Sequence, residues 1–283
     1  RKKIPRSNFG TGDAILLVSL FASVLLLRFA QIRDLALPAW VDSLHHTLVV
    51  RIITEKGQIP DSFAPYLPAS FFYHFGFHTL SVFFGQLTGL EPTQAILIIG
   101  QVLNALACIS IYHLAFTLTH RRAIGLASAA LVGFVSQMPA YYVAWGRYTL
   151  LTGMVLLPVA MATALDIWQT SECFTKGICL AILTSGIILT HYLVAVFHAC
   201  FLIIVILFGD MKKTKAKWRR KQQIARLLLW SILGVILVLP WILRIWDDIR
   251  PYLQVTIWPR VQVDRAYFPD YMDYIWYLIG PTR

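Results

Sequence analysis

The sequence predicts an all-α polytopic membrane protein: a bundle of transmembrane helices whose first outer loop is large and carries amphipathic helices. Composition is the first reason, because 58% of the 283 residues are hydrophobic, 14% are charged and the mean hydropathy is +0.65. A soluble domain of this length cannot bury so much apolar surface. The second reason is that the apolar residues gather in runs long enough to cross a bilayer, where helices satisfy their own backbone hydrogen bonds.

Five runs have spanning length or nearly so, and two further segments are ambiguous. The five runs are residues 14–30, 93–119, 123–139, 150–168 and 225–246. Segment 66–90 is apolar but contains two histidines and several glycines. Segment 177–208 is too long for one upright helix and carries the polar sequence "THY" near its middle, so it is either a tilted helix or a hairpin.

The distribution of basic residues favours one of two topologies. If segment 66–90 spans and segment 177–208 is one helix, Arg121 and Arg122 face outside. If segment 66–90 lies on or dips into the outer face and segment 177–208 is a hairpin, fifteen of the 25 Lys and Arg residues are cytoplasmic, with four acids. The second topology places the whole net charge of +11 inside, as the positive-inside rule favours. It predicts seven spans, a cytoplasmic N-terminus and a large outer loop at residues 31–92.

The net charge raises the question of nucleic acid, and the sequence argues against it. The densest basic run, "KKTKAKWRRK", lies between two apolar segments, and no basic groove with interleaved aromatic residues is visible. We interpret this run as a cytoplasmic loop that contacts anionic headgroups. Membrane lipids, and not nucleic acid, are the expected partners of this charge.

The outer loop opens with the stretch "LPAWVDSLHHTLVVRIITEKGQIPD". Residues 39–56 predict an amphipathic helix in the outer interface, with Trp40 as an anchor. One face carries Asp42, His45, His46 and Val49, and an apolar side carries Leu44, Leu48 and Ile52. A carboxylate, two imidazoles and Arg51 beside a membrane suit both proton transfer and phosphate binding. The alternative is a solvated polar face on a surface helix.

This stretch resembles the first outer loop of the GT-C glycosyltransferases, which include oligosaccharyltransferases, protein mannosyltransferases and aminoarabinose transferases. Members carry an acidic residue early in that loop and an aromatic, His or basic residue about a turn later, and "DSLHH" looks like one version of this motif. The order of later segments is also similar: "FFYHFGFHTLSVFFGQLTG" in the loop, a span ending in "THRR", an outer turn with "YYVAWGRYTLLTGMVLLP" and a hairpin tip "ILTHYLVAVF". The likeness covers about residues 14–246.

The resemblance implies an integral-membrane glycosyltransferase of the plasma membrane and cell envelope, which moves a sugar from a polyprenyl-phosphate donor to an acceptor at the outer face. The first-loop carboxylate of the family, a general base or acceptor-orienting group, corresponds to Asp42. A carboxylate can take the proton that an acceptor hydroxyl loses as it attacks the anomeric carbon. An inverting displacement of phosphate needs only this one carboxylate when cations stabilise the departing charge. His45, His46 and Arg51 are the predicted substrate-binding residues of the loop.

The second outer turn departs from the family pattern, because residues 140–153 contain no acid where many relatives carry one. A metal that bridges the first two outer loops is therefore not predicted, and no metal or other cofactor is assigned. Arg147 is the only charge in the turn and is predicted to bind the lipid phosphate through its planar guanidinium; the alternative is an arginine that snorkels to the interface. His191 and Tyr192 would cap the hairpin near the same cavity and are also predicted to bind substrate.

Two other functional classes remain open. A lipid or solute transporter would place ionisable residues at mid-depth in its spans, often with repeat symmetry, whereas these spans are almost free of acids and show no internal repeat. A non-catalytic GT-C-like subunit would keep the fold without the reaction. In the enzyme interpretation, residues 1–246 form the catalytic membrane module, and residues 247–283 form an outer loop and the start of a further span.

Overall fold

The computed structural model describes residues 10–170, 174–209 and 217–250. Within these residues the secondary structure is helical, without a β-strand and with one isolated bridge between Ser62 and Ser70. The predicted all-α membrane bundle is confirmed. The chain forms two compact units, residues 1–241 and 242–283, and the first contains the features described below. Most of the predicted outer segment 247–283 lies outside the described residues.

The helices follow one another with short connections. In chain order they are α1 (Thr11–Ile32), α2 (Val41–Lys56), α3 (Gly76–Thr88), α4 (Pro92–Thr119), α5 (Arg122–Ala130), the π-helix η1 (Leu131–Val135), α6 (Gln137–Ala144), α7 (Tyr148–Gln169), α8 (Phe174–Thr190), α9 (Tyr192–Phe208) and α10 (Lys217–Arg244).

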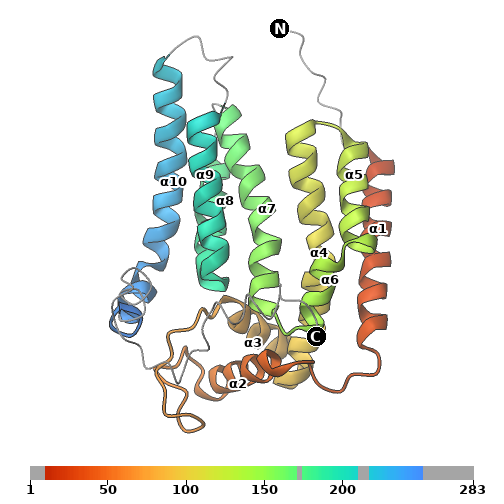
Figure 1. The fold of residues 1–283 in the computed structure, drawn as a ribbon, viewed down its shortest axis with the longest axis vertical. Coiled ribbons are helices and arrows are strands. Elements are labelled where there is room, and N and C mark those ends of the chain that lie inside the picture. Colours follow the sequence, from red (N-terminus) through yellow and green to blue (C-terminus); the bar gives the residue numbers. More distant parts are fainter. Residues whose placement is uncertain (1–9, 171–173, 210–216, 251–283) are drawn as a thin grey trace, which may run out of the picture. The chain divides into compact units, whose positions relative to one another are not determined.

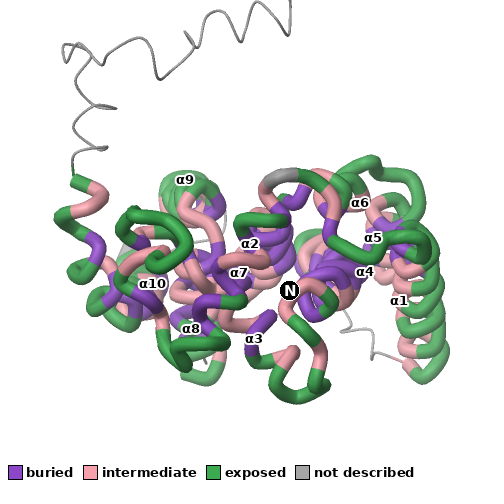
Figure 2. The backbone as a smooth tube through the Cα atoms, turned by 90° about the horizontal axis from the view of Figure 1, so that it is seen from below, coloured by how far each residue is buried: buried purple, intermediate pink, exposed green. Residues whose placement is uncertain are grey.

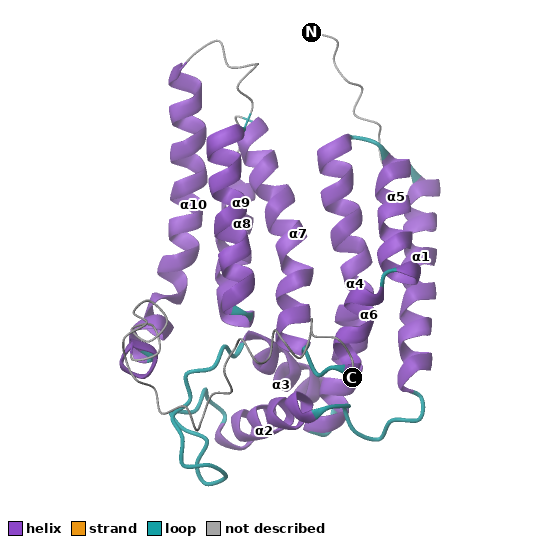
Figure 3. Ribbon diagram, in the orientation of Figure 1, coloured by secondary structure: helices purple, strands orange, loops and turns teal. Residues whose placement is uncertain are grey.

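The long helices alternate in direction between the two ends of the bundle (Figure 1). α1 runs toward the end where α2 and α3 lie, which we call the α2–α3 end, and α4 returns from it. The α5–η1–α6 segment runs to the α2–α3 end, α7 returns, α8 and α9 form a hairpin that turns there, and α10 runs back toward it (Figure 3). This is the predicted order of spans, outer loop and hairpin.

Length separates these segments into two groups. Among the described helices, five segments are long and apolar enough to cross a membrane: α1, α4, Arg122–Ala144, α7 and Arg220–Arg244. α8 and α9 have 17 residues each, which is about 25 Å of helix. Segment 66–90 does not span, because its helix α3 has 13 residues and packs against α2 and α4 at the end of the bundle.

α4 and α7 form the centre of the bundle, and α1 and α10 form its apolar periphery. α4 packs against α1, α5 and α7, and α7 packs against α8 and α9. Figure 2 shows buried residues concentrated on α4 and α7, whereas α1 and α10 are mostly exposed. Exposed apolar residues on helices of spanning length are the surface that lipid covers.

The segment predicted as one span at residues 123–139 is longer and broken. Its helical turns widen at η1, and Met138 leaves the helical conformation before α6 begins its regular turns. Pro139 cannot donate a helical hydrogen bond, and the side chain of Asn104 donates to its carbonyl at 2.8 Å. Arg28, 2% exposed, donates from Nη2 to the Gly133 carbonyl and from Nε to Asn104 Oδ1, both at 2.8 Å. These bonds satisfy polar groups that the break releases inside the membrane.

The described basic residues near the helix ends lie mainly away from α2 and α3. Arg122 pairs with Asp13, and Lys176 Nζ lies 2.8 Å from Asp166 Oδ2, both at the opposite end (Figure 1). Arg220 donates to the carbonyls of Ile206 and Leu207 at the end of α9. This arrangement agrees with the charge asymmetry on which the predicted topology depends.

Candidate functional site

The α6–α7 turn packs on the first turn of α2, and a glycine makes the contact possible. Gly146 has φ +66°, and a Cβ atom there would lie 2.7 Å from Ser43 Oγ and 2.8 Å from Ser43 N. A side chain would therefore meet both backbone strain and a steric clash. The contact brings together the residues beside it, Asp42 on α2 and Arg147 in the turn.

Asp42 and Arg147 form an ion pair that reaches solvent. Arg147 Nε lies 3.6 Å from Asp42 Oδ2, and the side chains of Arg147 and Asp42 are 49% and 39% exposed, respectively. The Arg147 guanidinium also lies 5.5 Å from the centre of the Trp145 ring, a cation–π contact. The sequence predicted separate roles for these two residues, and the fold places a carboxylate and a guanidinium where one ligand can touch both.

His46 lies behind this pair and joins three elements. The side chain is 4% exposed, its Nδ1 lies 2.9 Å from Nε2 of His78 on α3, and its ring also hydrogen-bonds the backbone of Gly146. Burial lowers the pKa of His46 to about 4, although the Asp42 charge opposes this effect. A neutral, enclosed imidazole holds α2 against α3 and the α6–α7 turn. The structure gives His46 a positioning contact, and the substrate contact that sequence analysis assigned to it stays a prediction.

The other predicted residues of α2 point elsewhere. His45 is exposed, because neighbouring helical residues point about 100° apart. The predicted apolar side is only partly buried, because Ile52 is enclosed but Leu44 is 60% exposed, while Val49 of the predicted polar face is buried. Arg51 pairs with Glu55 at 2.8 Å on an exposed face and lies about 13 Å along the helix from Asp42. The structure thus leaves Arg51 outside the Asp42–Arg147 site.

The tip of the α8–α9 hairpin carries His191 and Tyr192, which were predicted to cap the hairpin. It packs against His74 in the loop before α3. The His74 ring centre lies 4.9 Å from that of His191 and 5.1 Å from that of Tyr192. Tyr192 donates to the Phe72 carbonyl at 3.3 Å and accepts from Trp241 at 3.4 Å. Burial and, to a lesser degree, the Arg147 charge lower the pKa of His191. The hairpin tip therefore lies within electrostatic range of the ion pair.

Sequence reasoning missed Tyr73, which precedes α3 in an irregular loop. The residue is 37% exposed, and its ring centre lies 6.2 Å from that of His46. Burial raises its pKa, with smaller effects from a hydrogen bond to Thr149 and from the charges of Asp42 and Arg147. A tyrosine in an irregular segment carries no spacing signal, so only the fold places it beside the ion pair.

The histidines do not assemble into a metal site within the described residues. His74 and His78 are separated by one helical turn in sequence, but His78 bonds to His46 while the His74 ring faces His191. No group of three His, Cys, Asp or Glu side chains in the described part of the chain could hold a metal ion. Both ring nitrogens of His74 are buried without a hydrogen-bond partner.

Comparison with known proteins gives a family without a described activity. No curated protein matches the chain. Residues 2–269 match a family described as a family of unknown function (DUF6541). Because this match covers most of the chain, the protein belongs to the DUF6541 family.

Proposed function

We propose that this protein is an integral-membrane glycosyltransferase of the GT-C type, which transfers a sugar from a polyprenyl-phosphate donor to a hydroxyl-bearing acceptor. The observation that carries the proposal is the partly exposed pair of Asp42 and Arg147 at the end of an apolar bundle, with 3.6 Å between carboxylate oxygen and guanidinium nitrogen. A lipid-borne phosphate and a water-borne hydroxyl meet at such a position.

The two side chains supply complementary parts of an inverting displacement. The acceptor oxygen forms a bond to the anomeric carbon while the bond from that carbon to the phosphate oxygen breaks. Asp42 takes the proton of the acceptor hydroxyl, and the polyprenyl phosphate leaves with its electron pair. Arg147 stabilises the charge on the departing phosphate through a planar set of donors. One carboxylate is sufficient because the phosphate needs no proton to leave.

Residues around the pair prepare it without taking part in the bond changes. His46 and His78 fix the first turn of α2 against α3 and the α6–α7 turn. Tyr73 and His191 lie within electrostatic range of the pair, and we assign them to binding of substrate hydroxyls. Preorganised neighbours of this kind keep the reacting groups at a productive separation.

The outer face of the plasma membrane is the proposed location of the site, with the N-terminus inside. The support is the positive-inside rule: Arg122, Lys176 and Arg220 are at the end of the bundle opposite to α2 and α3. A cysteine introduced at His45, an exposed position on α2, would test the orientation, because labelling by a membrane-impermeant reagent from the cytoplasmic side alone would contradict it.

The alternative function, a transporter, would need a polar route through the spans. Arg28 could belong to such a route because it is a charged residue within the spanning helix α1. It is a buried cation in α1, but the side chain of Asn104 and the carbonyl of Gly133 engage it. These contacts give Arg28 a structural role in joining α1, α4 and η1. A glycosyltransferase therefore accounts better than a transporter for the solvent-exposed charges of Asp42 and Arg147.

Purified protein in lipid nanodiscs can test the reaction directly. Incubation with polyprenyl-phosphate-linked mannose, glucose or arabinose labelled in the sugar should release polyprenyl phosphate and transfer label to a glycoside acceptor. The matched control is Asp34→Asn, because Asp34 is an exposed carboxylate of the same loop that pairs with Arg33 at 3.1 Å. Absence of release from every donor, from protein that binds them, would overturn the proposed function in favour of a non-catalytic role.

A further inference from the structure

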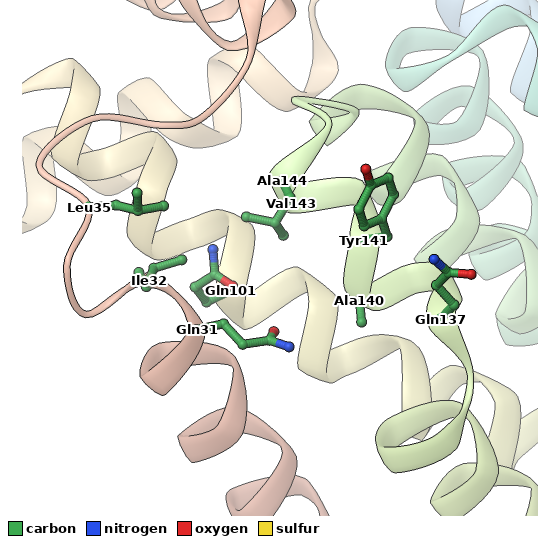
Figure 4. A pocket seen from close by; sticks show the side chains of 9 residues that line it. All are labelled: Gln31, Ile32, Leu35, Gln101, Gln137, Ala140, Tyr141, Val143 and Ala144. Carbon is green, nitrogen blue, oxygen red and sulfur yellow. The ribbon is translucent and has the colours of Figure 1, made fainter.

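A cavity of about 320 Å³ lies next to the α6–α7 turn, between the end of α1, α4 and α6. Figure 4 shows Gln31 and Gln101 pointing into the same space from α1 and α4, with Gln137 and Tyr141 bordering it on α6. Apolar side chains that include Ile32 and Val143 complete the wall. The volume is at the lower end of the range for small-molecule sites, about 300–1,000 Å³.

Hydrogen bonds within their own helices, α1 and α4, orient two of the amides. Gln31 Oε1 accepts from Arg28 Nη1 at 3.4 Å, and Gln101 Nε2 donates to the Leu97 carbonyl at 3.2 Å. Within the described part of the chain, this leaves the Gln31 amide nitrogen as a donor and the Gln101 amide oxygen as an acceptor. The cavity therefore offers both kinds of hydrogen-bonding group at fixed positions.

The chemistry of the wall selects an uncharged, hydroxyl-rich ligand. No Lys, Arg, Asp or Glu is among the described residues that line the cavity, so a phosphate or an ammonium group would find no ion-pair partner on its wall. Hydroxyl groups both donate and accept, as the mixed amides require. The apolar wall and the Tyr141 ring suit the C–H faces of a sugar ring.

The position of Gln137 gives a second reason to expect a polar ligand. It is an exposed amide within Arg122–Ala144, a segment apolar enough to span a membrane. It begins α6 and precedes the last residue of that segment, Ala144, by the length of α6. A carboxamide at that depth is costly against hydrocarbon unless something hydrogen-bonds to it.

The cavity also lies close to the ion pair along the chain. Ala144, which lines it, is three residues before Arg147, so their Cα atoms are at most about 11 Å apart. A ligand that fills the cavity can therefore extend toward Arg147 and Asp42.

We propose that this cavity binds a sugar ring of the carbohydrate substrate, an inference that rests on the proposed glycosyl transfer. The ring belongs either to the lipid-linked donor or to the acceptor, and the two sources share the same hydroxyl chemistry. Gln101 and Gln137 bind its hydroxyl groups, while Arg147 and Asp42 act outside the cavity.

Equilibrium binding to the full-length protein in nanodiscs separates the two sources. The probes are polyprenyl phosphate, the same lipid carrying mannose, glucose or arabinose, and the methyl glycosides of these sugars. The variants are Gln137→Leu, on an exposed position, and Gln101→Leu. The matched control is Gln86→Leu, because Gln86 lines a different cavity between α2, α3 and α4.

If the cavity holds the donor sugar, Gln137→Leu weakens binding of a sugar-bearing lipid about tenfold, the effect of one hydrogen bond, and leaves sugar-free polyprenyl phosphate unchanged. If it holds the acceptor, only binding of a methyl glycoside weakens. Unchanged binding of every sugar probe in folded Gln137→Leu and Gln101→Leu, or no binding of any sugar probe to the wild-type protein, would overturn the proposal. A third outcome is that the glutamine variants weaken glycoside binding but the wild-type protein releases no polyprenyl phosphate. That result would support the sugar site in the cavity and contradict the proposed glycosyl transfer.

Discussion

The Nδ1 atom of His46 lies 2.9 Å from the Nε2 atom of His78, and this contact joins α2 to α3. Both side chains are buried, at 4% and 0% exposure. His46 follows Asp42 by one helical turn, so the contact fixes the carboxylate on the side of α2 that faces Arg147. His46 and His78 thus hold α2 in the position at which Asp42 pairs with Arg147.

Asp42→Asn tests the general base. The amide has the size of the carboxylate but cannot take the proton, so we expect turnover to fall at least about a hundredfold while the protein stays folded and binds donor. Release of labelled polyprenyl phosphate measures turnover, with Asp34→Asn as the control of unchanged activity. Near-normal transfer by Asp42→Asn would remove Asp42 from the mechanism.

Arg147 variants test the phosphate contact. We expect Arg147→Ala to weaken donor binding by at least about tenfold, and Arg147→Lys to recover only part of this loss, because lysine restores the charge without the planar pair of donors. Binding of polyprenyl phosphate without a sugar is the direct measurement. Arg51→Ala is the matched control, since Arg51 pairs with Glu55 on an exposed face. Equal donor affinity in Arg147→Ala and the wild-type protein would contradict the assignment.

His46→Ala is expected to act through position and stability. It leaves the buried His78 nitrogen without its partner, which costs about 1–3 kcal/mol of unfolding free energy, and it frees Asp42 to move from Arg147. We expect a lower unfolding temperature and a larger fall in kcat than in donor affinity. His45→Ala, at the exposed neighbouring position, should change neither. A His46→Ala variant with lost donor binding and normal kcat would indicate substrate contact instead.

Alanine variants of two glycines with similar φ angles distinguish the cost of backbone strain from the cost of a steric clash. Gly146 has φ +66° and packs against Ser43, whereas Gly57 has φ +65° and a Cβ atom placed on it would have no neighbour within 4 Å. Both Ala variants carry the cost of a left-handed residue, about 1–2 kcal/mol. Only Gly146→Ala should also push the α6–α7 turn from α2 and reduce turnover. Thermal unfolding and transfer assays measure the two effects, and equal losses in both variants would contradict a role for the close contact.

Acidification should destabilise the α2–α3 end of the bundle. The pKa of His46 is about 4 in the folded protein because burial disfavours its charged form, against about 6.5 in an unfolded chain. The unfolded state therefore binds more protons between these values, and stability is lost as pH falls from about 6.5 toward 4. Burial also lowers the pKa of His74 and His78, which adds in the same direction.

Unfolding temperature measured against pH checks this expectation. The decline below about pH 6.5 should be shallower in His46→Gln, which cannot titrate. An equal slope in His46→Gln and the wild-type protein would assign the titration to other groups.

The sequence by itself determined the class of the protein and the course of its chain. Apolar runs such as the one that became α4 predict spans because helix length and hydrocarbon thickness are tied together. The asymmetry of basic residues predicted that segment 66–90 stays at one end and that the chain turns at "THY", as α3 and the α8–α9 hairpin show. The length of an apolar run is a local property and the distribution of basic residues is a sum along the chain, so both can be evaluated without knowing how the helices pack.

Only the tertiary structure decided which polar residues meet. Composition and spacing suggested one cluster on α2, but neighbouring residues on a helix point in different directions, so His46 is enclosed while His45 is exposed and Arg51 pairs elsewhere. The break at η1 and Pro139 depends on Arg28 and Asn104, which come from other helices. The pairing of Asp42 with Arg147 likewise depends on how closely Gly146 approaches Ser43. Contacts between distant segments depend on packing of the whole bundle, which no local pattern encodes.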